Sequence, residues 1–116
     1  MSYTINFALE LECLDKDELL DRINGKSDFI LVDTIGNYNG NRFKISGART
    51  IPYPEVIDRR QELLSFQEII IYCKHSECVA SKKVALGLKL LNIPNVKIYE
   101  GGIDEWVESR LPVEDE

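Results

Sequence analysis

Three short apolar runs constrain the fold of this chain more than any other feature. They are "FILVD" at residues 29–33, "EIIIYC" at 68–73 and "VKIY" at 96–99. Each run is too short for a buried helix, and continuous apolar character is typical of a strand covered on both faces. We therefore expect these runs to form the centre of a parallel sheet.

Segments with helical patterns alternate with the apolar runs. The sequence predicts a first helix over 14–23, with Asp15 as N-cap, Glu18 three residues later and Gly25 at its end. Pro54 is expected to open a second helix over 54–64. Further helices are predicted over 80–91 and 103–109. Strands that alternate with helices indicate an α/β domain built on a parallel sheet.

The remaining segments complete the expected sheet. "FALELE" at 7–12 alternates apolar and acidic residues, as a half-buried strand does, and "ARTIP" at 48–52 favours another short strand. Residues 34–47 are rich in glycine and asparagine, which predicts an irregular connection. The acidic end "VEDE" is expected to be solvated. The total is about five parallel strands flanked by helices.

Length and composition limit the class of protein. With 116 residues, the chain is expected to form one domain over 1–116. Its 44% hydrophobic and 29% charged residues are typical of a soluble globular protein. No apolar run approaches the ~20 residues of a membrane span, and "MSYTINF" does not have the pattern of a signal peptide. We expect a cytoplasmic protein without a membrane partner.

The net charge is −6, which argues against nucleic acid as a partner because that binding needs a basic surface.

The three cysteines are Cys13, Cys73 and Cys78. In the cytoplasm such residues are reactive thiols, metal ligands or core residues more often than structural disulfides. Cys73 ends an apolar strand, and ligands of α/β sheets bind at the carboxyl ends of strands. Cys73 is therefore a candidate nucleophile, with a small buried core residue as the alternative.

Four motifs, in order, resemble the rhodanese-like (sulfurtransferase) family. They are "LVD" ending at Asp33, "GARTIP" at 47–52, "IIIYC" ending at Cys73, and "YEGGIDEW" at 99–106. The resemblance spans roughly residues 7–110 and implies the three-layer rhodanese-like fold. It further implies a sulfurtransferase without a cofactor, in which Cys73 takes sulfane sulfur as a persulfide. The partners would be a small-molecule sulfur donor and a thiol acceptor, either a small molecule or a protein.

Several positions depart from the family pattern. Ile35 replaces the usual arginine after the first aspartate, and Lys44 replaces a usual histidine. The loop "CKHSECVA" is two residues longer than usual, with Lys74 in place of one arginine and Cys78 in place of another. The chain resembles a subgroup with a Cys-x-x-x-x-Cys loop. Thiosulfate is expected to be a poor donor, because lysine is a point charge where arginine offers a bidentate fork.

The resemblance implies a set of substrate-binding residues around Cys73. They are Lys74, His75, Ser76, Glu77 and Val79 in the loop, with Asp33 and Lys44 from elsewhere. Asp33 either orients the loop or substrate, or is a solvated or capping carboxylate. Arg42 and Lys44 either approach a bound anion or are surface charges. Tyr99, Gly101, Gly102 and Trp106 are expected to be core and turn positions.

The loop also bears on the reaction. Sulfur transfer needs a thiolate, and successive loop amides leading into a helix N-terminus would favour one at Cys73. Lys74, Lys82 and Lys83 would add positive charge. Cys78 either resolves a persulfide or sulfenate on Cys73 by forming a disulfide, or accepts sulfur from Cys73, or packs where the loop meets the helix. Cys13 is assigned no role.

Other functions remain in competition. His75 is the only histidine, and without a fourth ligand the sequence predicts no metal site with Cys73 and Cys78. A cysteine-dependent phosphatase or arsenate reductase would need fixed positive charge, usually an arginine, and the loop has none. A non-catalytic rhodanese-like binding or regulatory module is the third class.

Overall fold

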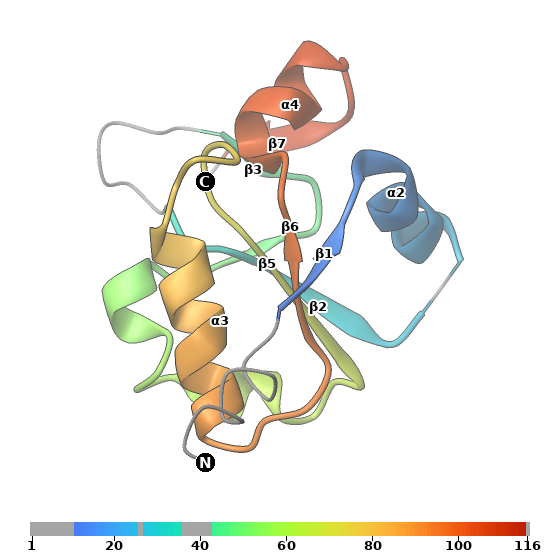
Figure 1. The fold of residues 1–116 in the computed structure, drawn as a ribbon. Helices are drawn as coiled ribbons and strands as arrows, with labels where there is room; N and C mark the ends of the chain where they lie inside the picture. Colours follow the sequence, from blue (N-terminus) through green and yellow to red (C-terminus); the bar gives the residue numbers. More distant parts are fainter. Residues whose placement is uncertain (1–10, 26, 36–42, 116) are drawn as a thin grey trace.

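The centre of the fold is a five-stranded parallel sheet (Figure 1). The computed structural model describes residues 11–25, 27–35 and 43–115. The strands are β1 (Glu12–Leu14), β2 (Phe29–Asp33), β4 (Arg49–Thr50), β5 (Glu68–Tyr72) and β6 (Val96–Tyr99). Their order across the sheet is β1-β6-β5-β2-β4, and every pairing is parallel. The predicted sheet and its three apolar strands are confirmed, with β5 in the middle.

Helices cover both faces of this sheet. They are α2 (Lys16–Asn24), α3 (Ala80–Leu90) and α4 (Gly102–Glu108). Figure 1 shows α3 and α2 on opposite sides, with α4 above the end of β6. The start of α2 is fixed by the predicted capping box: Asp15 accepts a hydrogen bond from the Glu18 amide, and the Glu18 side chain accepts one from the Asp15 amide.

Alternate residues of β5 divide the core into two clusters. Ile69 and Ile71 face the cluster that contains Leu88 of α3. Ile70 and Tyr72 face the cluster that contains Leu19 of α2 and residues of α4. Because a strand presents successive side chains to opposite faces, the continuous apolar run is what a sheet covered on both sides requires.

The predicted boundaries near the amino end need correction. Of the strand expected over 7–12, residues 7–10 lie outside the described part, and the described strand runs from Glu12 to Leu14. Leu14 therefore belongs to β1, opposite Tyr99, and not to the following helix. The helix begins later than predicted because the capping box places its first residue after Asp15.

Two segments expected to be irregular or solvated pair with each other. Within the connection over 34–47, Phe43–Ile45 forms β3, and the acidic end forms β7 (Val113–Asp115). The two strands form an antiparallel two-stranded sheet, with Lys44 opposite Glu114. A strand of only three residues carries little local sequence signal. The sequence therefore did not predict that β3 and β7, which lie far apart along the chain, would pair.

The helix predicted over 54–64 is wrong. The chain instead forms two 3-10 turns, η3 (Tyr53–Glu55) and η4 (Arg60–Leu63). The β-branched pair Val56 and Ile57, followed by Asp58, has low helix propensity. Val56 and Leu63 are nevertheless fully buried, so the two turns supply the apolar contacts expected of a helix.

No helix in the described part of the chain is long and apolar enough to span a bilayer.

Candidate active site

Cys73 directly follows β5, the middle strand, at the carboxyl edge of the sheet. It is 7% exposed and packs in the cluster that contains Tyr72 and Trp106. This is the position predicted for it from the sequence. It is also the edge at which open α/β sheets bind ligands.

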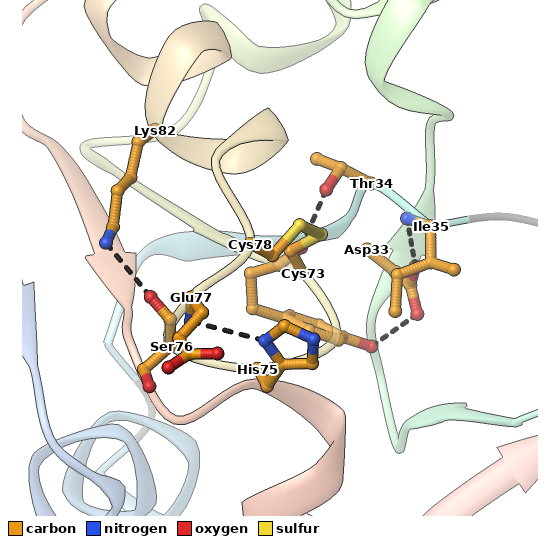
Figure 2. Close-up of a disulfide and its surroundings, with 10 residues drawn as sticks. Asp33, Thr34, Ile35, Cys73, His75, Ser76, Glu77, Cys78 and Lys82 are labelled. Atoms are coloured by element: carbon orange, nitrogen blue, oxygen red, sulfur yellow. Dashed lines mark hydrogen bonds between the residues drawn. A yellow bond between two sulfur atoms is a disulfide. The ribbon is translucent and has the colours of Figure 1, made fainter.

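The loop after Cys73 folds back on itself through local hydrogen bonds (Figure 2). The Cys78 amide donates to the His75 carbonyl oxygen at 3.1 Å, and the Glu77 amide donates to His75 Nδ1 at 3.2 Å. The Lys82 Nζ atom reaches back from α3 to the Ser76 carbonyl oxygen at 3.0 Å. Residues 74–77 and Val79 are exposed. The loop therefore has a defined backbone shape with its side chains open to solvent.

A disulfide joins Cys73 and Cys78, with their Cα atoms 6.4 Å apart. Figure 2 shows the bond between the two sulfur atoms. The separation lies within the range of about 4.4–6.8 Å that a disulfide accepts. Cys78 is half-buried and packs against the edge of the same cluster as Cys73. The sequence places the two cysteines in one loop, but only the fold turns their sulfurs toward each other.

Asp33 is not a solvated carboxylate, because it is fully buried at the end of β2. It accepts hydrogen bonds from the Ile35 amide at 2.8 Å and from the Tyr72 hydroxyl at 2.7 Å. The Tyr72 hydroxyl in turn accepts a hydrogen bond from the Ile45 amide at 2.9 Å. The expectation that Asp33 binds substrate stays a prediction. Asp33 ties together the segments that end at the carboxyl edge, just below Cys73.

Thr34 adds a further link at this edge. Its amide and its Oγ1 both donate to the Tyr72 carbonyl oxygen, at 3.2 and 2.9 Å. Its own carbonyl oxygen accepts from the Tyr53 amide at 2.9 Å. Thr34 thereby fixes the peptide that immediately precedes Cys73. The sequence reasoning missed this residue, although it stands directly after the aspartate that ends a core strand.

Lys74 and Lys82, two of the three lysines expected to add positive charge around Cys73, form ion pairs with acids. Lys74 Nζ lies 3.0 Å from Asp104 Oδ1, and Lys82 Nζ lies 3.9 Å from Glu100 Oε2. Lys44 is half-buried on β3, not in an irregular loop. Arg42 lies outside the described residues. The charges of Lys74 in the loop and Lys82 in α3 are therefore partly balanced by neighbouring carboxylates.

Gly102 has a structural role that the sequence reasoning did not assign. Its φ of +71° is unfavourable for residues with a side chain, and a Cβ there would lie 2.6 Å from the carbonyl oxygens of Cys73 and Lys74. This close approach lets the amides of Ile103 and Asp104 donate to those two oxygens, each at 3.0 Å. The expected turn at Gly102 therefore also holds the backbone of the Cys73 loop.

Aromatic side chains support the same face of the sheet. Tyr99 meets Tyr72 and Trp106 edge to face, with ring centroids 6.4 and 5.8 Å away. Burial, followed by the hydrogen bond to Glu105, raises the pKa of Tyr99 far above its usual range. The predicted core positions of Tyr99 and Trp106 are confirmed.

An acidic groove of about 560 Å³ lies beside the loop. His75 and Ser76 form one side, and Cys13 lies in its lining. The acidic residues that line it are Asp15, Glu18, Glu100, Glu105 and Glu108. Cys13 carries a free thiol. Partial burial is the largest cause that raises the pKa of this thiol, and the negative charge of Glu100 raises it further, whereas the positive charge of Lys82 opposes both. This shift favours the thiol over the reactive thiolate.

Within residues 11–25, 27–35 and 43–115, no three His, Cys, Asp or Glu side chains are grouped to hold a metal ion.

The chain belongs to the family described as "Rhodanese-like domain", whose pattern matches residues 15–109. No curated protein matches the chain. Among solved structures, the BH2092 protein from Bacillus halodurans is 27% identical, with a TM-score of 0.75. That match covers 97% of this chain and 81% of the other.

Two further structures share the fold. A rhodanese-related protein from Thermoplasma volcanium is 21% identical, with a TM-score of 0.70, over 89% of this chain and 97% of the other. A thiosulfate sulfurtransferase from Pseudomonas aeruginosa is 18% identical, with a TM-score of 0.73. It is matched over 90% of this chain and 20% of its own length. The predicted family and fold are thus confirmed.

Proposed function

We propose that this protein is a sulfurtransferase, of a subgroup with a Cys-x-x-x-x-Cys loop, and that Cys73 is its nucleophile. The observation that carries the proposal is the position of Cys73 at the carboxyl end of the middle strand, within a hydrogen-bonded loop. Membership of the rhodanese-like family supports the same reaction class. Reduction of the disulfide frees the thiol that the reaction needs.

The reaction has two displacement steps. The Cys73 thiolate attacks the transferable sulfur of a donor and forms an S–S bond with it. The bond that held this sulfur breaks, an S–S bond in thiosulfate or polysulfide and a C–S bond in 3-mercaptopyruvate. The electron pair leaves with sulfite, the shortened polysulfide or the enolate of pyruvate. Cys73 then carries a persulfide. In the second step an acceptor thiolate attacks the outer sulfur, and the Cys73 thiolate leaves. The Cys73 sulfur is thus nucleophile in the first step and leaving group in the second.

The surrounding residues are positioning residues in this proposal. Thr34 donates two hydrogen bonds to the Tyr72 carbonyl oxygen and so holds the peptide before Cys73. The amides of Ile103 and Asp104 in α4 hold the carbonyl groups of Cys73 and Lys74. These contacts fix the direction in which the loop leaves the sheet. The loop residues His75, Ser76, Glu77 and Val79 are exposed around the sulfur and are proposed to contact the donor.

We expect thiosulfate to be a poor donor compared with 3-mercaptopyruvate, which carries a single negative carboxylate charge. Lys74 is paired with Asp104, and acidic side chains line the groove beside His75. A dianion therefore meets unfavourable charge near the loop. Glu105→Gln and Asp104→Asn are expected to raise loading by thiosulfate more than loading by 3-mercaptopyruvate. An equal change in loading by thiosulfate and by 3-mercaptopyruvate would show that charge does not explain the difference between the two donors.

Intact mass of the reduced protein tests the function itself. The protein is incubated separately with thiosulfate, 3-mercaptopyruvate and sodium polysulfide, and then desalted. The Cys78→Ser variant is expected to gain one sulfur atom, which peptide mapping places on Cys73. Cys73→Ser should gain none at that position, and Cys13→Ser should behave as the unmodified chain. A folded protein that gains no sulfur from any donor would instead be a binding module.

A further inference from the structure

We infer that Cys78 is a second catalytic thiol, which resolves the Cys73 persulfide, releases sulfide and leaves a disulfide that a dithiol must reduce. This inference rests on the first step of the proposed function, the formation of the Cys73 persulfide. It replaces the second step by attack of Cys78, with a dithiol as the final reductant. The Cys73–Cys78 disulfide requires no movement of the described fold, since the Cα atoms lie 6.4 Å apart. The turn closed by the Cys78 amide and the His75 carbonyl oxygen holds Cys78 over the strand end.

The chemistry balances without an oxidant. The Cys78 thiolate attacks the inner sulfur of the persulfide, Cys73 Sγ, and forms the Cys73–Cys78 bond. The bond between Cys73 Sγ and the outer sulfur breaks, and the outer sulfur leaves as hydrosulfide with the electron pair. The sulfane sulfur is reduced by two electrons, and the two cysteine thiols supply them.

The difference in exposure determines how the disulfide is reduced. Cys73 is 7% exposed, whereas Cys78 is half-buried between the exposed residues Glu77 and Val79. An incoming thiolate therefore reaches Cys78 more easily than Cys73. Attack at Cys78 forms a mixed disulfide there and releases the Cys73 thiolate, so the nucleophile for the next donor is regenerated.

This order favours a dithiol over a monothiol as reductant. After attack at Cys78, the released Cys73 thiolate lies beside the mixed disulfide and can attack it, which expels a monothiol. An intramolecular thiol acts at an effective concentration on the order of millimolar or more. A dithiol has a second thiolate that breaks the mixed disulfide first, yielding its own disulfide and two cysteine thiols. The net reaction converts sulfane sulfur and a dithiol into sulfide and a disulfide.

A single-turnover experiment tests the resolving step. Reduced protein is freed of reductant, loaded briefly with sodium polysulfide and desalted, and sulfide and intact mass are followed over time. The unmodified chain should release one sulfide per loaded chain as the disulfide forms. The Cys78→Ser variant should keep its persulfide at least about tenfold longer, because it lacks the intramolecular thiol. Cys13→Ser, the matched control, should decay as the unmodified chain does.

The outcomes separate the two proposals. Equal persulfide lifetimes in the unmodified chain and Cys78→Ser would overturn the role of Cys78 while leaving the sulfurtransferase intact. A Cys78→Ser variant that never acquires sulfur on Cys73 would overturn both. In steady state with sodium polysulfide, the unmodified chain should accumulate more of the Cys73–Cys78 disulfide with glutathione than with dithiothreitol at equal thiol concentration, as measured by intact mass. Equal accumulation of this disulfide with the two reductants would contradict the preference for a dithiol.

Discussion

At the scale of single residues, the candidate site depends on close backbone contacts. Gly102 brings the start of α4 against the peptides of Cys73 and Lys74, where no side chain fits. Asp33 and Tyr72 form a buried hydrogen-bonded pair directly below the same loop. These contacts fix the backbone on either side of Cys73.

Gly102→Ala is expected to lower the free energy of unfolding by about 1–3 kcal/mol, because the positive φ and the contacts with two carbonyl oxygens both oppose a methyl group. Loading of Cys73 with sulfur should also slow. Urea denaturation measures the first effect and intact mass the second. Gly87→Ala is the control: it lies in helix α3 and meets only the Ile57 side chain, so its stability should be unchanged or slightly raised. Equal effects of the two substitutions would contradict this account.

Tyr72→Phe removes the hydrogen bonds that the hydroxyl makes with Asp33 and the Ile45 amide. Since both groups are buried, the expected loss of stability is about 1–3 kcal/mol. Chemical denaturation of the reduced variant measures it. A loss below about 0.5 kcal/mol, typical of a surface substitution, would mean that this pair does not stabilise the strand end.

At the scale of elements, Glu68 connects three of them at the start of β5. Its carboxylate binds Arg22 of α2 at 3.1 and 3.2 Å and Lys97 of β6 at 2.5 Å. The Glu68 and Lys97 side chains are only 14% and 16% exposed, so solvent screens this contact less than a surface pair. The cluster fixes α2 against the sheet at the edge opposite Cys73.

The pH dependence of stability tests this cluster. Burial raises the pKa of Glu68, but the hydrogen bonds and charges of Arg22 and Lys97 outweigh it and lower the pKa below its usual value. A carboxyl whose pKa is lower in the folded state adds stability above the unfolded pKa of about 4.3. That stability is lost as the pH falls through the folded pKa.

Glu68→Gln should therefore cost on the order of 2 kcal/mol near neutral pH, and much less in acid. Urea denaturation at several pH values checks this. Glu55→Gln is the control, because the exposed pair of Glu55 with Arg59 is worth little at any pH. A Glu68→Gln deficit that stays constant from neutral pH into acid would show that packing, not charge, explains it.

At the scale of the whole molecule, the disulfide is local, whereas the core is distributed over both faces of the sheet. The disulfide links residues only five apart. The two apolar clusters contain side chains from α2, α3 and α4 and from the five parallel strands or their immediate ends, within the described part of the chain. The fold is therefore expected to persist when the disulfide is broken, as a turnover cycle requires.

Reduction with dithiothreitol should leave the far-ultraviolet circular dichroism spectrum unchanged. It should lower the free energy of unfolding by no more than roughly 2 kcal/mol, since the closed loop is short and constrains the unfolded chain little. Thermal and urea unfolding of oxidised and reduced protein give the comparison, with Cys78→Ser as the variant that cannot form the bond. Unfolding upon reduction would make the disulfide structural and would contradict a catalytic cycle.

The parallel sheet, the capping box at Asp15 and the position of Cys73 were all predictable from the sequence. Each depends on a local pattern: a continuous apolar run, residues three apart at a helix start, or a cysteine directly after a strand. The order of four motifs was sufficient to predict the family, because together they extend over most of the chain.

Only the tertiary structure decided how residues distant in sequence meet. Local patterns could not reveal that β3 pairs with the acidic end, that Asp33 is buried against Tyr72, or that Asp104 pairs with Lys74. They also could not show that Gly102 lies against Cys73, or that the Cys73 and Cys78 sulfurs face each other. The physical reason is that apolar periodicity is set by the strand or helix itself. Hydrogen bonds, ion pairs and thiol contacts instead depend on distances that exist only after the sheet and its helices have packed.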